Sequence, residues 1–308
     1  MRLRRWAAIV ASATFLVNSA AAQQAYSGRS HQLDVRIPRL EAVPAIDGQL
    51  DEPVWQQAAR LTGFSQYSPT DGIPAADSTD VLVWYSPTAI YFGIKAYEAH
   101  GAVHGTLANR DNIFSDDNIQ IYLSTFHDGR QATVFAVNPL GVQADGVLVE
   151  SGRSTGNSVF GNPVTGGREP IDLSSDYVFQ SKGRLTPWGY EVEVRIPFKS
   201  LRYQSTRSQD WGLNVERDVQ HDGTTQTWTP ARRAAASFLG QSGTLAGITD
   251  IHRGLVMDLN PEVTGRRDWA VDPGTGAYGY RNEGPDIGGN VRWGVSNNLT
   301  LNGTANPD

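Results

Sequence analysis

Apolar and polar residues alternate in a series of short segments along most of the chain. A period of two places every second side chain on one face of a β-strand, which is typical of strands that bury one face. The segments are residues 34–40, 81–85, 89–97, 118–123, 132–138, 177–183, 190–198 and 211–219. Turn residues separate them at a spacing that is typical of β-sandwiches. The pattern therefore predicts an all-β fold, a β-sandwich.

One short helix is expected near the start of this series, within AIDGQLDEPVWQQA at residues 45–58. Asp47 and the glycine after it suit a tight turn, and Asp51 is placed to cap a helix that has Pro53 in its first turn. Trp55 would then lie on the apolar face of the helix, together with Val54. The segment therefore predicts Trp55 as a core anchor packed on the sheet.

The first 22 residues have the order of a cleavable export signal. Three arginines precede an apolar run over residues 6–17, and three alanines follow at residues 20–22. This order is typical of signal peptides, and the run is too short to span a bilayer. We therefore expect an exported chain whose residues 23–32 form a flexible polar leader.

Composition narrows the chemistry further. The chain has 308 residues and no cysteine, which excludes disulfides, thiolate zinc sites, iron–sulfur clusters and a cysteine nucleophile. Its formal net charge is −6, and loss of the three signal arginines would make it −9. A negative chain is a poor partner for nucleic acid, so we expect no nucleic-acid binding.

The last part of the chain, residues 251–308, has its own strand pattern. LVMDLNPEV at residues 255–263 and NVRWGVSNNLTLNGT at 290–304 alternate as lipid-facing and lumen-facing positions of a membrane β-strand do. Two or three strands cannot close a barrel, so this chain would not span a membrane by itself. We interpret residues 251–308 as the first strands of a truncated outer-membrane-like β domain. The alternative is that they complete a soluble sandwich.

Four stretches resemble a known family. IDGQLDEPVW at residues 46–55 is similar to the start of family 9 carbohydrate-binding modules. VLVWYSPTAIYFGIKAYE, SDDNIQIYLST and GYEVEVRIPFKSL, at residues 81–98, 115–125 and 189–201, resemble later strands of that family. The resemblance covers about residues 33–250. It implies a sandwich that binds oligo- or polysaccharides without catalysis, with structural calcium as in many members.

A longer stretch at residues 110–146, RDNIFSDDNIQIYLSTFHDGRQATVFAVNPLGVQADG, resembles a bacterial subgroup of these modules. In that subgroup the module precedes an uncharacterised outer-membrane-like β-barrel domain. The resemblance implies a cell-envelope protein of the periplasm or outer membrane, attached to the outer membrane through a C-terminal domain. Modules of the family as a whole are commonly attached to glycan-degrading enzymes, which implies a link to carbohydrate catabolism.

A saccharide site needs a flat aromatic face and fixed polar groups for the sugar hydroxyls. Trp228 lies in the polar stretch TTQTWTPARR, so we expect it to be an exposed platform. Arg217 would lie near it if the two strands pair as a hairpin through an Asp-Gly turn at residues 222–223. The predicted binding residues are Trp228, Arg217, Trp84, Arg110, Asn138 and Glu193. The alternative is that the tryptophans are core residues and the charges form surface pairs.

Calcium is the metal that suits this chain best. Asp47, Asp51, Asp116 and Asp117 offer hard oxygen ligands in turn-like contexts, although their spacing is not that of an EF-hand. The same residues also suit a helix cap and a turn before a strand. His100 and His104 stand four residues apart, but glycines beside them weaken the helix that would align them as a zinc pair.

Catalytic signatures are scarce. The sequence contains no G-x-S-x-G elbow and no phosphate-binding G-x-x-x-x-G-K, so binding is favoured over catalysis. Three alternatives stay open. They are a periplasmic interaction or plug domain, a component of a glycosidase that acts on O-glycosyl bonds, and a haem-binding sandwich. Met257, the only methionine after the signal, lies outside the predicted sandwich, which disfavours a Met/His haem site.

Overall fold

The computed structural model describes residues 23–150, 170–254, 256–265, 267–282, 285–295 and 299–306. The predicted export signal, residues 1–22, lies outside the described residues. The described part of the chain contains nineteen strands and three short 3-10 helices, which confirms the predicted all-β class. None of the helices in this part is long and apolar enough to cross a membrane.

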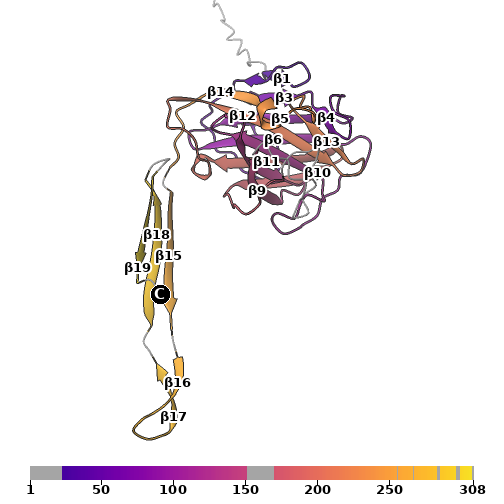
Figure 1. Ribbon diagram of the computed structural model, residues 1–308. Coiled ribbons are helices and arrows are strands. Elements are labelled where there is room, and N and C mark those ends of the chain that lie inside the picture. Colours follow the sequence, from indigo (N-terminus) through magenta and orange to yellow (C-terminus); the bar gives the residue numbers. More distant parts are fainter. Residues whose placement is uncertain are drawn as a thin grey trace, which may run out of the picture.

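Two large sheets form the body of the protein (Figure 1). Sheet A has the order β1 (Ala25–Ser27), β3 (Ala59–Thr62), β5 (Thr79–Tyr85), β6 (Ala89–Tyr97), β11 (Gly189–Pro197) and β10 (Gln180–Thr186). Sheet B has the order β2 (Asp34–Val35), β14 (Gly243–Thr249), β12 (Ser208–Val219), β7 (Asn118–Ser124), β8 (Gln131–Val137) and β9 (Gln143–Val149). Strand β13 (Thr224–Thr227) pairs with β12 and with β4 (Ser65–Ser68).

The main core lies between the two sheets. Val81, Val83, Phe92 and Ile94 project into it from the central strands of sheet A and are wholly buried. Apolar side chains of sheet B, such as Val215, belong to the same cluster. The alternation read from the sequence therefore corresponds to one buried face on each sheet.

The outer face of sheet A is partly covered by the IDG segment, residues 45–58. Its helix is a 3-10 turn, η1 (Pro53–Gln57), and Trp55 is 2% exposed, which confirms the predicted core anchor. The predicted cap is wrong, because Glu52 occupies the N-cap position without a side-chain capping bond and Asp51 is exposed. Gly48 adopts φ +87° in the predicted tight turn, a conformation that favours glycine.

The prediction that residues 23–32 form a flexible leader is wrong, because this polar stretch contains strand β1. This strand pairs in parallel with β3, and Tyr26 is buried in the main core. Gly28 lies so close to the backbone of Trp228 that a Cβ would stand 1.7 Å from its carbonyl oxygen. Pairing with β3, one buried aromatic ring and a close backbone contact together order this polar segment.

The tail forms a separate, narrow set of strands that extends away from the sandwich (Figure 1). A three-stranded sheet consists of β15 (Val256–Thr264), β18 (Asp286–Gly294) and β19 (Thr300–Ala305), and β16 (Arg267–Val271) pairs with β17 (Tyr278–Asn282). The register places Leu259 opposite Val291 and Asp258 opposite Arg292. One face of the three-stranded sheet is therefore apolar and the other polar.

Candidate functional site

Trp228 is wholly buried, so the prediction that it is an exposed platform is wrong. Its ring packs over Gly243, and its indole N–H donates to the Tyr26 carbonyl at 3.4 Å. The polar residues before it are buried as well, because strand β13 lies between β12 and β4. The hairpin from β12 to β13 is confirmed, with Gly223 at φ +67° in its turn.

Arg217 lies in the interior and joins the two sheets. From β12 of sheet B it donates to Thr79 Oγ1 at 3.1 Å, to the Tyr97 carbonyl at 2.8 Å and to Glu98 Oε2 at 3.1 Å. Its guanidinium lies 5.8 Å from the ring centroid of Tyr190. The side chain is 0% exposed, which removes it from any solvent-facing saccharide site.

Trp84 and Glu193 lie beneath the IDG segment. Trp84 is wholly buried and stacks on Tyr91, with the ring centroids 4.0 Å apart. Glu193 accepts hydrogen bonds from the amides of Asp47 and Gly48, both at 2.8 Å, and from the indole N–H of Trp55 at 3.1 Å. Its carboxyl group therefore holds the segment against sheet A.

Burial raises the pKa of Glu193 to about 7, although its hydrogen bonds with Gly48, Asp47 and Trp55 oppose the shift. A raised pKa in the folded state means that the stability it contributes is present below about pH 4.5 and is lost as the pH rises through about 7. We expect this loss to be about 2 to 3 kcal/mol in the free energy of unfolding. Denaturant unfolding from pH 4.5 to 8 measures it, and Glu193→Gln should lack it. Parallel pH profiles for the two proteins would contradict the assignment.

The other predicted binding residues have partners within the protein. Arg110 forms an ion pair with Asp145 and donates to the Tyr177 carbonyl at 2.8 Å. Asn138, wholly buried, donates to Asp116 Oδ2 at 2.8 Å. The structure thus brings two predicted saccharide residues next to predicted calcium residues: Asn138 next to Asp116, and Glu193 next to the amide of Asp47.

Three of the four predicted calcium ligands accept hydrogen bonds from other groups of the protein. Asp116 accepts from the amide and the hydroxyl of Thr106, and Asp117 accepts from the amides of His104 and Gln220. Asp47 accepts from the amide of Gln49, and Asp51 is exposed. The structure does not bring all four together as one group of ligating atoms among the described residues, and calcium stays a prediction.

An open strip on the outer face of sheet A was missed by the sequence reasoning. Three ion pairs cross the strands there: Arg60 with Asp80 at 2.7 Å, Lys95 with Glu191 at 3.6 Å, and Arg184 with Glu191 at 2.6 Å. We call them the charged row. Beside them the half-buried rings of Tyr97 and Trp188 lie with their centroids 4.8 Å apart. In its alternating strand Tyr97 occupies a position that faces outward, and this position indicates the open strip from the sequence.

A pocket of about 770 Å³ opens at one end of this strip. Tyr97, Arg60 and Asp80 line it, and Asp77 and His100 close one side. Burial and the nearby Asp80 raise the pKa of Tyr97, so its hydroxyl keeps its proton. The pocket therefore combines the half-buried ring of Tyr97 with hydrogen-bond donors and acceptors.

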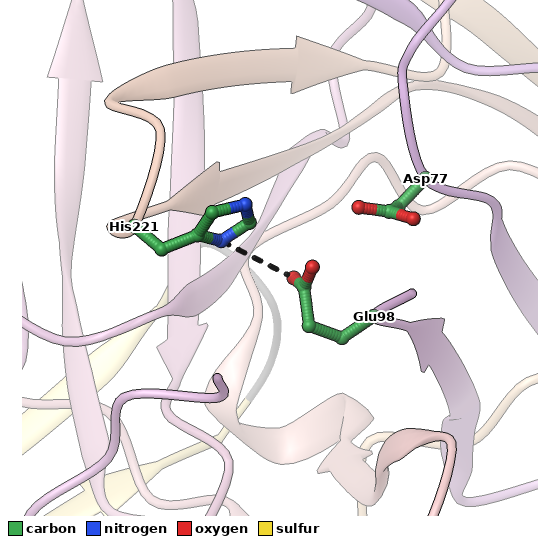
Figure 2. Close-up of side chains that lie close together, drawn as sticks. All are labelled: Asp77, Glu98 and His221. Carbon is green, nitrogen blue, oxygen red and sulfur yellow. Dashed lines mark ion pairs between the residues drawn. The ribbon is translucent and has the colours of Figure 1, made fainter. Parts of the chain in front are cut away.

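The Asp77–Glu98–His221 cluster lies next to the pocket, at the edge where the two sheets meet (Figure 2). Asp77 precedes β5, Glu98 follows β6, and His221 lies in the turn after β12. The carboxylate of Glu98 lies between the other two side chains, and its Oε2 is 3.7 Å from His221 Nδ1. His100 Nδ1 lies 2.8 Å from Asp77 Oδ1.

The two carboxyl groups of this cluster differ in proton affinity. Burial, and then a hydrogen bond with Asp77, raise the pKa of Glu98, while Arg217 opposes the shift. Burial also acts to raise the pKa of Asp77, but hydrogen bonds with the Ala99 amide, Glu98 and His100 outweigh it and lower the pKa. Of the two carboxyl groups, Glu98 therefore takes up a proton more readily than Asp77.

Comparison with known proteins gives similarity in fold only. No protein-family model matches the sequence. No curated protein matches it either. A family 9 carbohydrate-binding module from Caldicellulosiruptor kristjanssonii in complex with cellotriose is 16% identical, with a TM-score of 0.45, and the match covers 70% of this chain and 96% of that one. The same module in complex with glucose matches at 16% identity and a TM-score of 0.46, over 70% and 98%. A protein from Bacteroides uniformis, assigned provisionally to carbohydrate binding, is 11% identical with a TM-score of 0.48, over 73% and 98%.

Proposed function

We propose that the sandwich binds saccharides without catalysis, at the pocket beside Tyr97 and Trp188. The observation that carries the proposal is the half-exposed aromatic pair next to the charged row, on the part of the sheet face that the IDG segment leaves open. Aromatic faces stack on the apolar side of a pyranose ring, and fixed guanidinium and carboxylate groups bond its hydroxyls. The family resemblance of residues 33–250 supports the same function.

The aromatic pair replaces Trp228 in this proposal. Trp188 precedes β11 in the turn from β10, and its carbonyl accepts from the Glu98 amide at 2.9 Å, which fixes the turn on sheet A. Arg60 and Asp80 hold each other in a 2.7 Å ion pair, so their positions are set before a ligand arrives. Preorganised polar groups lower the ordering cost of binding.

Trp188→Ala is expected to weaken saccharide binding by about 1 to 3 kcal/mol, or roughly five- to 150-fold, because the stacking area is lost. Isothermal titration of the full chain with cellotriose and a panel of other oligosaccharides measures it. Cellotriose is the first probe because a module of the resembled family was solved with it. The melting temperature should change little, since the ring is only half-buried.

Trp269→Ala is the matched control, since that ring is 58% exposed and lies in the tail, on β16. It should leave saccharide affinity unchanged. If the wild-type chain binds no saccharide up to millimolar concentration, the proposal fails, and a periplasmic interaction domain takes its place. If Trp188→Ala binds as tightly as the wild type, the site lies elsewhere.

We further propose that the chain is exported and that the tail belongs to an outer-membrane-like β domain, in a protein linked to carbohydrate catabolism. The order of residues 1–22 supports export. The apolar face of the tail sheet supports a membrane setting, because Leu259, Val263 and Ile287 are 62%, 69% and 71% exposed. Fractionation of cells that express the complete reading frame tests this, and recovery from the cytosol would contradict it.

A further inference from the structure

The Asp77–Glu98–His221 cluster contains a buried oxygen that no hydrogen-bond donor satisfies. The side chain of Glu98 is 1% exposed, and its Oε2 accepts from Arg217 at 3.1 Å. Its Oε1 has no donor while both carboxyl groups are ionised. A buried acceptor without a partner is costly, so the position between Glu98 and Asp77 calls for a proton or a cation.

The balance of charge around Glu98 favours a cation. Asp77 and Glu98 carry two carboxylates, both of which are at most 9% exposed, and the buried Arg217 supplies a single fixed positive charge. Burial of unpaired charge is unfavourable, and buried carboxylates are found paired or on metals. The fixed charges of the cluster therefore leave one carboxylate uncompensated unless His100 or His221 is protonated.

We propose that Asp77, Glu98 and His221 bind one divalent transition-metal ion of the zinc type. Each side chain offers one ligand atom, and the three atoms lie within 4.8 Å of one another. Around tetrahedral zinc such atoms stand roughly 3.4 Å apart, so a small inward movement completes the site and leaves a fourth position for water. Two oxygens with an imidazole nitrogen suit zinc, whereas calcium and magnesium prefer oxygen alone.

The backbone beside the cluster leaves room for the imidazole. The ring of His221 packs against Gly101, where a Cβ would stand 2.5 Å from ring atom Cγ. A side chain at this position would force the ring to move. Gly101→Ala therefore displaces the His221 ligand but leaves all three ligand atoms in the chain. It tests whether metal binding depends on the position of the imidazole and not only on its presence.

Titration of the untagged full chain with Zn²⁺ tests the proposal, and Co²⁺ in place of zinc reports four-coordination through its visible spectrum. We expect one ion per chain. His221→Ala and Gly101→Ala should each lower the affinity at least about tenfold, since even outer ligands contribute that much. His252→Ala, which removes an exposed histidine outside the cluster, should not change it.

We expect both variants to fold without metal, because His221 lies in a turn with its side chain 22% exposed. Melting curves of the metal-free variants check this. The proposal is overturned if the wild-type chain binds no zinc, if binding survives His221→Ala, or if only calcium binds. The titration needs no sugar, so its failure is distinct from a failure of saccharide binding.

Discussion

Replacing Trp228 with alanine is expected to lower the free energy of unfolding by about 3 to 5 kcal/mol, the usual cost of a large aromatic truncation in a core. The ring is 0% exposed and belongs to the cluster between the two sheets. It also packs on Gly243 and donates to the carbonyl of Tyr26, so the cavity would open beneath β1. The neighbouring backbone is held by sheet hydrogen bonds and cannot collapse far into the space.

Chemical denaturation of the wild type and the variant measures this loss. Trp188→Ala is the matched comparison, because it removes the same side chain from a half-buried position and should cost less than about 1 kcal/mol. A loss below about 1 kcal/mol for Trp228→Ala would show that the ring is not a core residue and would reopen its role as a platform.

Arg217→Ala is expected to cost about 3 to 5 kcal/mol, because it leaves a buried carboxylate without its partner. The guanidinium is 0% exposed and donates to Glu98, to Thr79 and to the Tyr97 carbonyl. Without it, Glu98 has to take up a proton or stay unpaired, and the carbonyl loses its donor. The effect should therefore exceed that of a surface arginine.

Arg39→Ala is the control, since Arg39 pairs with Glu41 at the surface and such pairs contribute about 0 to 1 kcal/mol. Adding Glu98→Gln to Arg217→Ala should restore part of the stability by removing the unpaired charge. A double variant that is less stable than Arg217→Ala would show that the ion pair is not the source of the loss.

The strand positions could be predicted from the sequence because the central strands bury one face throughout. The segments at 81–85, 89–97 and 190–198 correspond to β5, β6 and β11 within a few residues. Strands β1 and β13 could not be predicted in this way. β1 has three residues with one buried ring, and β13 is polar but buried between two neighbours. Neither has an apolar repeat long enough to be seen.

The predicted site residues were chosen by chemical type, and the structure uses most of them internally. Glu193 has the carboxylate that a saccharide site needs, yet three donors from the IDG segment already occupy it. The Asn138 side chain stabilises the turn that follows it by accepting from the Val142 amide, and it also donates to Asp116. Apart from the bond with Val142, these contacts join residues far apart in the chain, and local patterns do not record them.

Trp84 and Tyr97 show what the sequence alone determined and what only the tertiary structure decided. The period of two in a β-strand places both rings on the outer face of sheet A, although VLVWY around Trp84 is wholly apolar and GIKAYE around Tyr97 alternates. In the fold, Trp55 from the IDG segment packs edge-on against Trp84, with the ring centroids 6.0 Å apart, while Tyr97 stays half-open beside Trp188. Alternation sets the side of the sheet on which a residue lies. Exposure depends on which distant segment covers that side, and the IDG segment covers one end of the face and leaves the other open.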